Sequence, residues 1–354
     1  MTLPKRALSS STCLCMVMLL CCNTEENRQP DSSRVDAGVQ DVGVERSLVD
    51  LPSELSRSDR SPGDLAPDIS TEPGLFELQT PERHLKLWWL GGGVVRFHYL
   101  PVGSPAQAER GWTMAVDAWP TEPLLARDDG QRWVIKTAAF SIFVHKSDAS
   151  VRIEGPQRQV LFGEKSQGSS AYSRKVIVEL PADAHIYGLG EKLGPLDKRG
   201  MALRMWNTDV LEDGSFNTDE DPLYQSIPYF IMHRSGKPAV GVYLASTFET
   251  RFDLGKARAD ELSFETMGGD LDYIFIYGPS IKEVVRGFTG LVGRMQLPPL
   301  WALGYHQCKW SYSPESEVRA ITQELRARKI PCDGIWLDID YMDGFRSFTW
   351  SPTA

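Results

Sequence analysis

The sequence has few cysteines outside its first residues. Of the six in 354 residues, only Cys308 and Cys332 lie beyond residue 22. Two cysteines do not make a disulfide framework. We expect two free, buried thiols, with a bond across adjacent strands as the alternative.

Basic residues are also in short supply, since the formal net charge is −9. Nothing in the sequence therefore indicates nucleic-acid binding. No His-x-His or two-His-one-carboxylate spacing occurs among the six histidines. Such spacings are typical of metal centres, so we expect neither a bound metal nor another cofactor.

No apolar run in the leader is long enough to cross a bilayer as a helix. Two basic residues precede a short apolar core at 16–20, and Cys21 and Cys22 follow it directly. Residues 1–22 therefore read as an export signal. The arrangement resembles a bacterial lipoprotein signal, in which Cys21 or Cys22 carries the lipid and anchors the protein to a membrane outside the cytoplasm. The residue before the cysteine, Leu20 or Cys21, is not the small Ala, Gly or Ser that is usual there, so plain secretion and no export stay open.

Residues 23–74 lack aromatic side chains altogether. They hold twelve Asp or Glu against five Arg, together with many Ser and Pro. Such a segment cannot bury enough apolar surface to offset the entropy lost on ordering. We therefore interpret it as a disordered acidic tether.

Apolar runs rich in Val, Ile, Phe and Tyr then recur between turn signals from 75 to 279. Examples lie at 94–99 and 140–144, and 228–244 reads as a hairpin with its turn at 234–237. About 200 residues of short strands without intervening helices indicate a large antiparallel β-sandwich.

The pattern changes at Ser280. A capping box there predicts the start of a connecting helix, which we place at 280–297. A strand is expected next at 303–310. A helix follows it, with Ser313 as the N-cap and Pro314 in the first turn. Its apolar face is Val318, Ile321 and Leu325, and the next strand runs over 335–340.

These last elements form one βαβ unit with parallel strands. Parallel strands need cover on both faces, so residues 298–354 are interpreted as the first strands and helix of a truncated (β/α)8 barrel. Such a barrel has about 250 residues. We therefore expect the chain to be an N-terminal fragment. The predicted fold class is β plus α/β.

Three carboxylates, Asp338, Asp340 and Asp343, crowd the end of that last strand. Strand alternation places Asp338 and Asp340 on one face and the apolar residues of the strand on the other. Carboxylates at the end of a buried strand usually bind sugar hydroxyls, a metal or a reacting bond.

Three stretches of the sequence carry a resemblance to a known family. They are Ile186–Lys192 continuing to Asp209, Gly304–Trp310 with Tyr312, and Trp336–Phe345 with Phe348, Thr349 and Trp350. Together they resemble glycoside hydrolase family 31, the retaining α-glucosidases and their relatives. The third stretch is more similar to the α-glucosidases than to the α-xylosidases. The resemblance implies a galactose mutarotase-like sandwich before a (β/α)8 barrel.

The resemblance implies a role for four residues in binding an α-glucoside. Asp338 hydrogen-bonds hydroxyls of the sugar at the cleavage site, Ile339 lines the pocket, and Trp310 forms part of its wall. Asp209, on a loop of the sandwich, contacts the sugar on the leaving-group side. Trp310 as core filler and Asp209 as a solvated acid are the alternatives. The family's nucleophile and acid/base lie on later barrel strands, so we expect no catalytic residue up to residue 354.

Other polar residues near these positions have structural explanations. We expect Asp340 and Asp343 to order the loop, His306 to be a fully hydrogen-bonded barrel histidine, and Glu191 and Lys192 to hold their glycine-rich turn.

The leading hypothesis is therefore an exported retaining glycoside hydrolase of α-glucosidase type, acting on α-glucosides or maltooligosaccharides and inactive as this chain alone. A non-catalytic carbohydrate-binding lipoprotein is the alternative. A metal-dependent hydrolase that uses His306, Asp338 and Asp340 is a third reading, which the residue spacing does not favour.

Overall fold

The computed structural model describes residues 74–81, 83–100, 113–115, 124–165, 174–209 and 220–352, and the pairing of a two-residue strand, β1 (Met18–Leu19). Apart from β1 and Gly74, the expected export signal, with Cys21 or Cys22, and the tether lie outside this part. The described residues form two compact units. One, here the sandwich unit, contains 74–209 and 220–294, and the other, the C-terminal unit, contains 295–352 and β1. Neither holds a described helix long and apolar enough to span a membrane.

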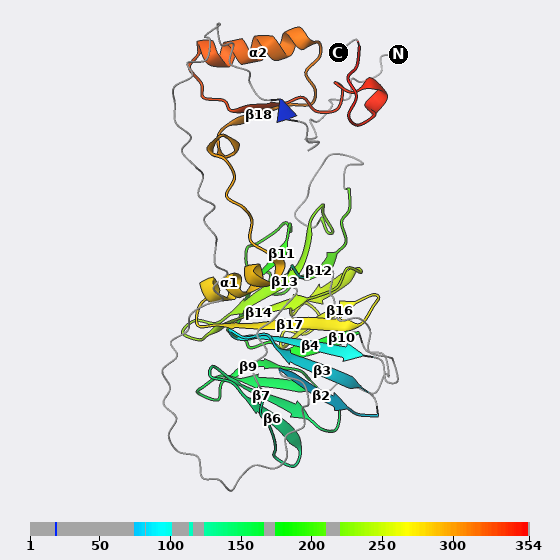
Figure 1. Cartoon of the computed structure of the whole chain (residues 1–354), viewed down its shortest axis with the longest axis vertical. Helices are drawn as coiled ribbons and strands as arrows, with labels where there is room; N and C mark the ends of the chain where they lie inside the picture. The colour runs from blue at the N-terminus through cyan, green and yellow to red at the C-terminus, as the bar shows by residue number, and fades with distance from the viewer. Residues whose placement is uncertain are drawn as a thin grey trace, which may run out of the picture. The chain divides into compact units, whose positions relative to one another are not determined.

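Three antiparallel sheets build the sandwich unit (Figure 1). The largest has seven strands in the order β11-β13-β14-β17-β4-β3-β2, and a five-stranded sheet follows the order β5-β6-β7-β8-β9. The third is β10-β16-β15-β12. The strands are β2 (Leu75–Gln79), β3 (His84–Trp89), β4 (Val94–Leu100), β5 (Ala126–Asp128), β6 (Arg132–Lys136), β7 (Ser141–His145), β8 (Val151–Glu154), β9 (Val160–Gly163), β10 (Lys175–Glu179), β11 (His185–Gly190), β12 (Ala202–Met205), β13 (Ser226–His233), β14 (Ala239–Leu244), β15 (Thr250–Asp253), β16 (Glu261–Thr266) and β17 (Leu271–Gly278).

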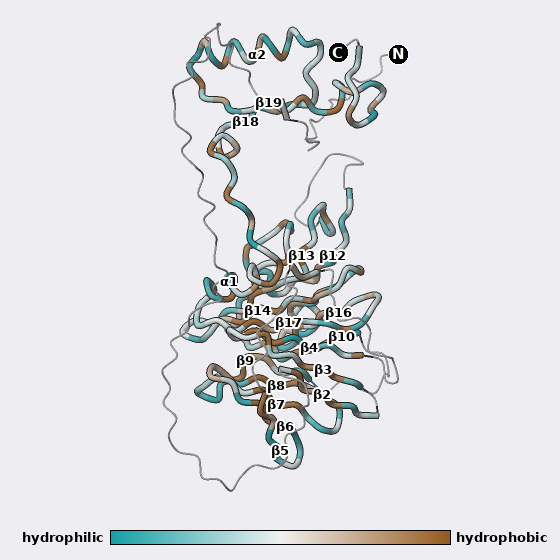
Figure 2. Tube along the Cα trace, in the orientation of Figure 1, coloured by the Kyte–Doolittle hydropathy of each residue, from teal (hydrophilic) through white to brown (hydrophobic). Residues whose placement is uncertain are grey.

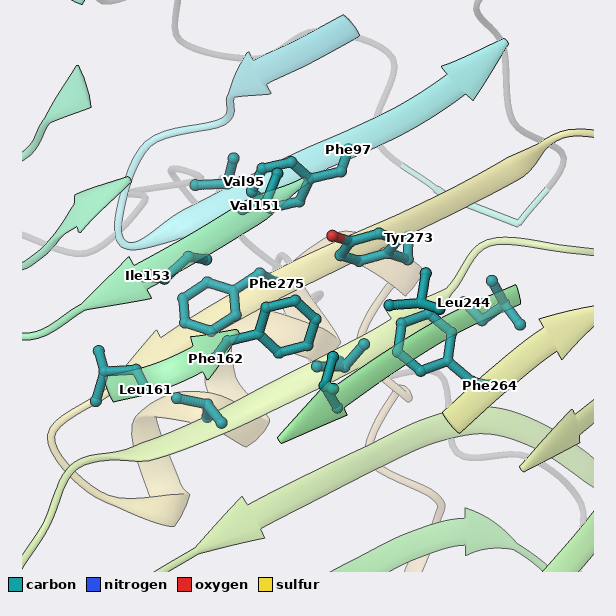
Figure 3. Close-up of a cluster of buried hydrophobic side chains, with 14 of the residues drawn as sticks. Val95, Phe97, Val151, Ile153, Leu161, Phe162, Leu244, Phe264, Tyr273 and Phe275 are labelled. Atoms are coloured by element: carbon teal, nitrogen blue, oxygen red, sulfur yellow. The ribbon is translucent and has the colours of Figure 1, made fainter. Parts of the chain in front are cut away.

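The hydrophobic core of this unit is shared by all three sheets. Figure 2 shows the hydrophobic stretches along the strands, and Figure 3 shows side chains from the different sheets meeting. Phe97 and Tyr273 of the largest sheet stack with centroids 5.1 Å apart, Phe162 of β9 lies 5.8 Å from Tyr273, and Phe264 of β16 lies 5.3 Å from it. Aromatic pairs at such distances contribute beyond their buried area. The β-rich pattern of the sequence is explained by this core.

The carboxylate of Glu164, a half-buried residue, ties the sheets together. It follows β9, and its backbone bridges Val178 of β10. Its carboxylate accepts hydrogen bonds from the hydroxyls of Tyr99 (2.9 Å) and Tyr273 (2.6 Å) and from the Val151 N–H (2.9 Å). These donors come from β4, β17 and β8. Burial raises the pKa of the Glu164 carboxyl above its ordinary value, although its hydrogen bonds act in the opposite direction.

Glycine is needed at the end of β11 because the backbone of β13 passes very close to it. Gly188 has φ +108° and Gly190 φ +76°, and the register with β13 shifts between them. A Cβ on Gly188 would lie 2.6 Å from the Tyr229 carbonyl oxygen. A side chain here would also strain the left-handed backbone. Glycine is therefore structural at this point of the motif.

The predicted hairpin is confirmed, with β13 and β14 joined by a turn in which the Lys237 N–H donates to the Arg234 carbonyl (3.1 Å). Helix α1 (Ile281–Val292) begins after Ser280 and packs on β14 and β17, as Figure 1 shows. The predicted capping box is wrong in detail. The Ser280 hydroxyl bonds the Glu283 carboxylate and makes no side-chain bond to the helix backbone.

The C-terminal unit contains the predicted βαβ unit. Strands β18 (His306–Cys308) and β19 (Gly334–Trp336) pair in parallel, and β1 pairs antiparallel with β19. Helix α2 (Glu315–Ala327) connects β18 to β19, and two 3₁₀ helices, η1 (Leu300–Leu303) and η2 (Asp343–Phe345), flank the unit. The inward face of α2 is as predicted, with Leu325 buried and Val318 and Ile321 packed against the same cluster.

Three details of this unit differ from the sequence prediction. The first strand is shorter than 303–310, because η1 occupies its start and Ser311 has φ +56° beyond its end. Pro314, and not Ser313, is the residue before α2, since Pro314 is extended and the Ser313 N–H donates to Glu317 (3.2 Å). The second strand ends at Trp336 and not at Asp340.

Both cysteines of this unit are free. Cys332 is buried, as expected, but Cys308 is exposed, so the prediction of two buried thiols is wrong for Cys308. The Cys332 thiol donates to the Gly334 carbonyl (3.3 Å).

Candidate functional site

The carboxylate of Asp338 is the centre of the candidate site. It lies two residues beyond β19 and is only 3 % exposed. One oxygen, Oδ2, accepts a hydrogen bond from the backbone N–H of Ser311 (3.2 Å). The other, Oδ1, is buried and has no hydrogen-bond partner within the described part of the chain. A buried charged oxygen without a donor is costly, so this arrangement favours binding a hydroxyl or N–H group from a ligand.

Ser311 contributes a second unsatisfied atom beside Asp338. Its Oγ is also buried without a partner among the described residues. Both residues have left-handed backbones, with φ +56° at Ser311 and +65° at Asp338. Strained backbone of this kind is concentrated at functional sites. Sequence reasoning did not identify Ser311, because no residue-type signal marks it between Trp310 and Tyr312.

The thiol of Cys308 lies in the electrostatic field of the same carboxylate. Although Cys308 is an exposed residue, partial desolvation raises the pKa of its thiol, and the negative charge of Asp338 raises it further. A raised pKa keeps the thiol protonated at neutral pH. Cys308 is therefore poorly suited to act as a nucleophile here.

Two of the expected pocket residues adjoin Asp338. Trp310 precedes Ser311, whose N–H contacts the carboxylate, and the Trp310 side chain is 65 % exposed. An exposed ring fits a pocket wall better than core filler, and this role of Trp310 stays a prediction. Ile339 follows Asp338 directly, is half-buried, and its carbonyl accepts the Met342 N–H (3.1 Å). Trp310 and Ile339 are thus linked to Asp338 through neighbouring backbone, and their roles in binding a sugar stay predictions.

The neighbouring carboxylates lie in different environments. Asp340 is exposed whereas Asp338 is buried, so the prediction that both lie on one strand face is wrong. The reason is that β19 ends at Trp336 and the left-handed Asp338 breaks the alternation. Asp343 forms an ion pair with Arg346, and its N–H donates to the Thr349 hydroxyl (3.0 Å). Asp343 therefore orders the loop around η2, as expected.

His306 has partners on both ring nitrogens. The Trp336 indole N–H donates to Nδ1 (3.1 Å), and Nε2 lies 3.2 Å from the Trp301 carbonyl oxygen. The ring also stacks between the two tryptophans, with centroids 5.9 and 5.8 Å away. This geometry fits a neutral histidine with Nε2 protonated. No three His, Cys, Asp or Glu side chains of the described residues gather as a metal site.

Asp209 belongs to the sandwich unit and is exposed, with the Tyr224 hydroxyl donating to its Oδ1 (3.0 Å). The glycine-rich turn before it is held by Lys192, whose buried ammonium donates to the Arg204 carbonyl (2.6 Å) and to Asp221 (2.5 Å). Glu191 accepts the Gln225 N–H (3.0 Å). Glu191 and Lys192 thus have the loop-ordering contacts expected of them.

Comparisons with known proteins agree with this architecture. Residues 84–253 match the glycosyl hydrolase 31 N-terminal galactose mutarotase-like domain, and residues 295–354 match the glycosyl hydrolases family 31 TIM-barrel domain. A mutarotase-like sandwich followed by barrel elements is the architecture of a glycoside hydrolase. The predicted fold class is confirmed, and the chain belongs to glycoside hydrolase family 31.

Individual relatives show how much of such a protein this chain corresponds to. It is 43 % identical over 219 residues to alpha-glucosidase 2 of Bacillus thermoamyloliquefaciens, covering 61 % of this chain and 27 % of the relative. Identity to the alpha-glucosidase of Saccharolobus solfataricus is 35 %, covering 56 % and 29 %. The structure of a family 31 dextranase from Flavobacterium johnsoniae aligns with TM-score 0.69 and 28 % identity, covering 80 % and 36 %. The chain thus spans about a third or less of these proteins.

Proposed function

We propose that this chain supplies the sandwich and the first sugar-binding segment of the barrel of a retaining α-glucosidase. The observation that carries the proposal is the buried Asp338, with one oxygen held by Ser311 and the other without a donor. A carboxylate in this state accepts directional hydrogen bonds from vicinal hydroxyls. The substrates we propose are α-glucosides and maltooligosaccharides.

The other binding residues follow from the same proposal. Exposed Trp310 offers a ring to the apolar face of a pyranose, and Ile339 lines the pocket beside it. Asp209, on the sandwich unit, contacts the sugar on the leaving-group side. The relatives support this reading, because two carry the name alpha-glucosidase and the dextranase is seen with isomaltotriose and with glucose.

We further propose that the 354 residues alone hydrolyse no α-glucoside. A retaining glycosidase needs two carboxyl groups about 5–5.5 Å apart that flank the anomeric carbon from opposite sides. Asp338 and Asp340 are two residues apart on one segment, and their burial differs. Neither pairs with the other as nucleophile and acid.

An assay of the purified chain on p-nitrophenyl α-glucoside tests this proposal. We expect release of nitrophenol no faster than in buffer. Turnover that disappears in the Asp338→Asn variant would make Asp338 catalytic and would overturn the assignment. Turnover that persists in this variant indicates a contaminating enzyme, which a second purification step removes.

We also propose that the protein is exported and anchored by a lipid on Cys21 or Cys22. The support is the leader sequence, in which a short apolar core directly precedes both cysteines. Mass spectrometry of the protein made in a Gram-negative bacterium should find a diacylglyceryl group on the mature N-terminal cysteine. A mature protein that lacks the lipid would instead support plain secretion.

A further inference from the structure

The sandwich unit contains a cleft that plays no part in the site around Asp338. Its volume is about 340 Å³, which lies at the lower end of the range for small-molecule sites. Three stretches far apart in the sequence form it: the segment after β12, the start of β13, and the loop between β14 and β15.

Two half-exposed aromatic rings line this cleft. Trp206 is 51 % exposed and Phe248 is 55 % exposed. Each ring is also supported from within the protein. The Arg204 guanidinium lies 5.8 Å from the Trp206 ring centroid, and Phe248 rests on the Gly268–Gly269 turn so closely that a Cβ on Gly269 would lie 3.0 Å from the ring. Supported rings that remain open to solvent are suited to stacking against a ligand.

The remaining lining of the cleft is uncharged, with Met205 and Pro228 apolar and the other residues polar. No Asp, Glu, Lys, Arg or His is among the described residues that line it, which argues against a phosphate, a carboxylate or a metal ion as ligand. Ser226 Oγ and Thr250 Oγ1 lie at this lining, buried and without a hydrogen-bond partner in the described chain, and the Thr250 residue is fully buried. Asn207 adds an amide.

We infer that this cleft binds one or two pyranose rings of a neutral oligosaccharide, stacked on Trp206 and Phe248. A pyranose combines an apolar face with hydroxyls at its rim, which matches two aromatic rings beside hydroxyl and amide groups. Trp206 lies three residues before Asp209 on the same segment. That the oligosaccharide is an α-glucan rests on the proposed function. The stacking on Trp206 and Phe248 is argued from the cleft alone.

Charge distinguishes this cleft from a neighbouring one in the same unit. It is lined by Arg204, Arg251 and Asp253, among others. Arg204 and Arg251 both pair with Glu249, at 2.9 Å each. Both guanidinium groups therefore already have a carboxylate partner, which leaves them less available to a ligand.

The test is to titrate the purified 354-residue chain with maltoheptaose and to measure binding by isothermal titration calorimetry or protein NMR. We expect binding that weakens about tenfold in Trp206→Ala and in Phe248→Ala, the loss expected for one stacked ring. Trp206→Phe should retain most of the affinity, because it keeps a ring. Leu196→Ala is the matched control, since Leu196 is an exposed apolar side chain of the same unit outside the cleft, and it should bind as the wild type does.

The variants also separate this inference from the proposed function. Binding that both ring variants leave unchanged, or an absence of binding by the wild-type chain, overturns the inference. If Asp338→Asn weakens binding and the two ring variants do not, the proposed function is supported and the cleft is not a sugar site. If binding depends on the two rings but the full-length protein has no α-glucosidase activity, the inference about the cleft stands and the proposed function is wrong. Melting curves confirm that each variant is folded.

Discussion

Replacing Asp338 with Asn is expected to lower kcat/KM on p-nitrophenyl α-glucoside about a thousandfold in the full-length α-glucosidase that we propose to contain this chain. The carboxylate is buried, and its Oδ1 has no donor in the described part of the protein. A hydrogen bond to a charged group contributes about 1.5–3 kcal/mol. Two bonds to sugar hydroxyls are thus worth about 4 kcal/mol, or about a thousandfold in rate.

The chain offers a matched control two residues away. Asp340 is also a carboxylate but is exposed, so Asp340→Asn should change kcat/KM by no more than about twofold. Asn has the shape of Asp and tolerates the left-handed backbone at 338, so Asp338→Asn should fold normally. Equal losses in the two variants, or no loss at Asp338, would show that the buried carboxylate does not bind substrate.

Replacing Glu164 with Ala is expected to destabilise the sandwich unit by about 4 kcal/mol. The change leaves the Tyr273 hydroxyl and the Val151 N–H without their acceptor in the core, whereas the Tyr99 hydroxyl keeps the Ala149 carbonyl (3.1 Å). Each buried donor left without a partner costs about 1–3 kcal/mol. Thermal unfolding should show a melting temperature lower by about 10 °C for a unit of this size. Glu179→Ala is the control, because its ion pair with Arg152 (3.6 Å) is solvent-exposed and should contribute less than about 1 kcal/mol.

The same residue gives this unit a dependence on pH with a definite sign. Burial raises the pKa of Glu164 in the folded protein. Its contribution to stability is therefore complete below the unfolded pKa of about 4.3 and is lost as the pH rises through the folded pKa. The free energy of unfolding of the wild type, relative to Glu164→Gln, should increase as the pH falls from 7 towards 4.5. A difference that stays constant or shrinks would contradict this assignment.

Much of the fold could be predicted because the sequence encodes it locally. The runs of Val, Ile and Phe form strands, and the apolar face of α2 packs as its spacing indicates. The errors lie where backbone conformation depends on distant contacts. Asp338 and Ser311 are left-handed and contact each other across 27 positions, so strand alternation misplaced Asp340.

The candidate site was predicted in part for a similar reason. Asp338, Ile339, Trp310 and Asp209 follow from a resemblance to known sequences, and the structure brings Ser311, the neighbour of Trp310, to the Asp338 carboxylate. The unsatisfied oxygens of the site cannot be read from residue types, because they depend on which donors tertiary packing leaves nearby. The cleft beside Trp206 brings together residues from three separate segments, and no local pattern links them.

The most direct test is a crystal structure, with glucose bound, of the full-length α-glucosidase that we propose to contain this chain. A sugar hydroxyl should lie about 2.7 Å or less from Asp338 Oδ1, with Trp310 beside the ring and the Ser311 N–H still bonded to Oδ2. Glucose bound elsewhere, with Oδ1 of Asp338 still lacking a donor or satisfied by another protein group, would contradict the assignment.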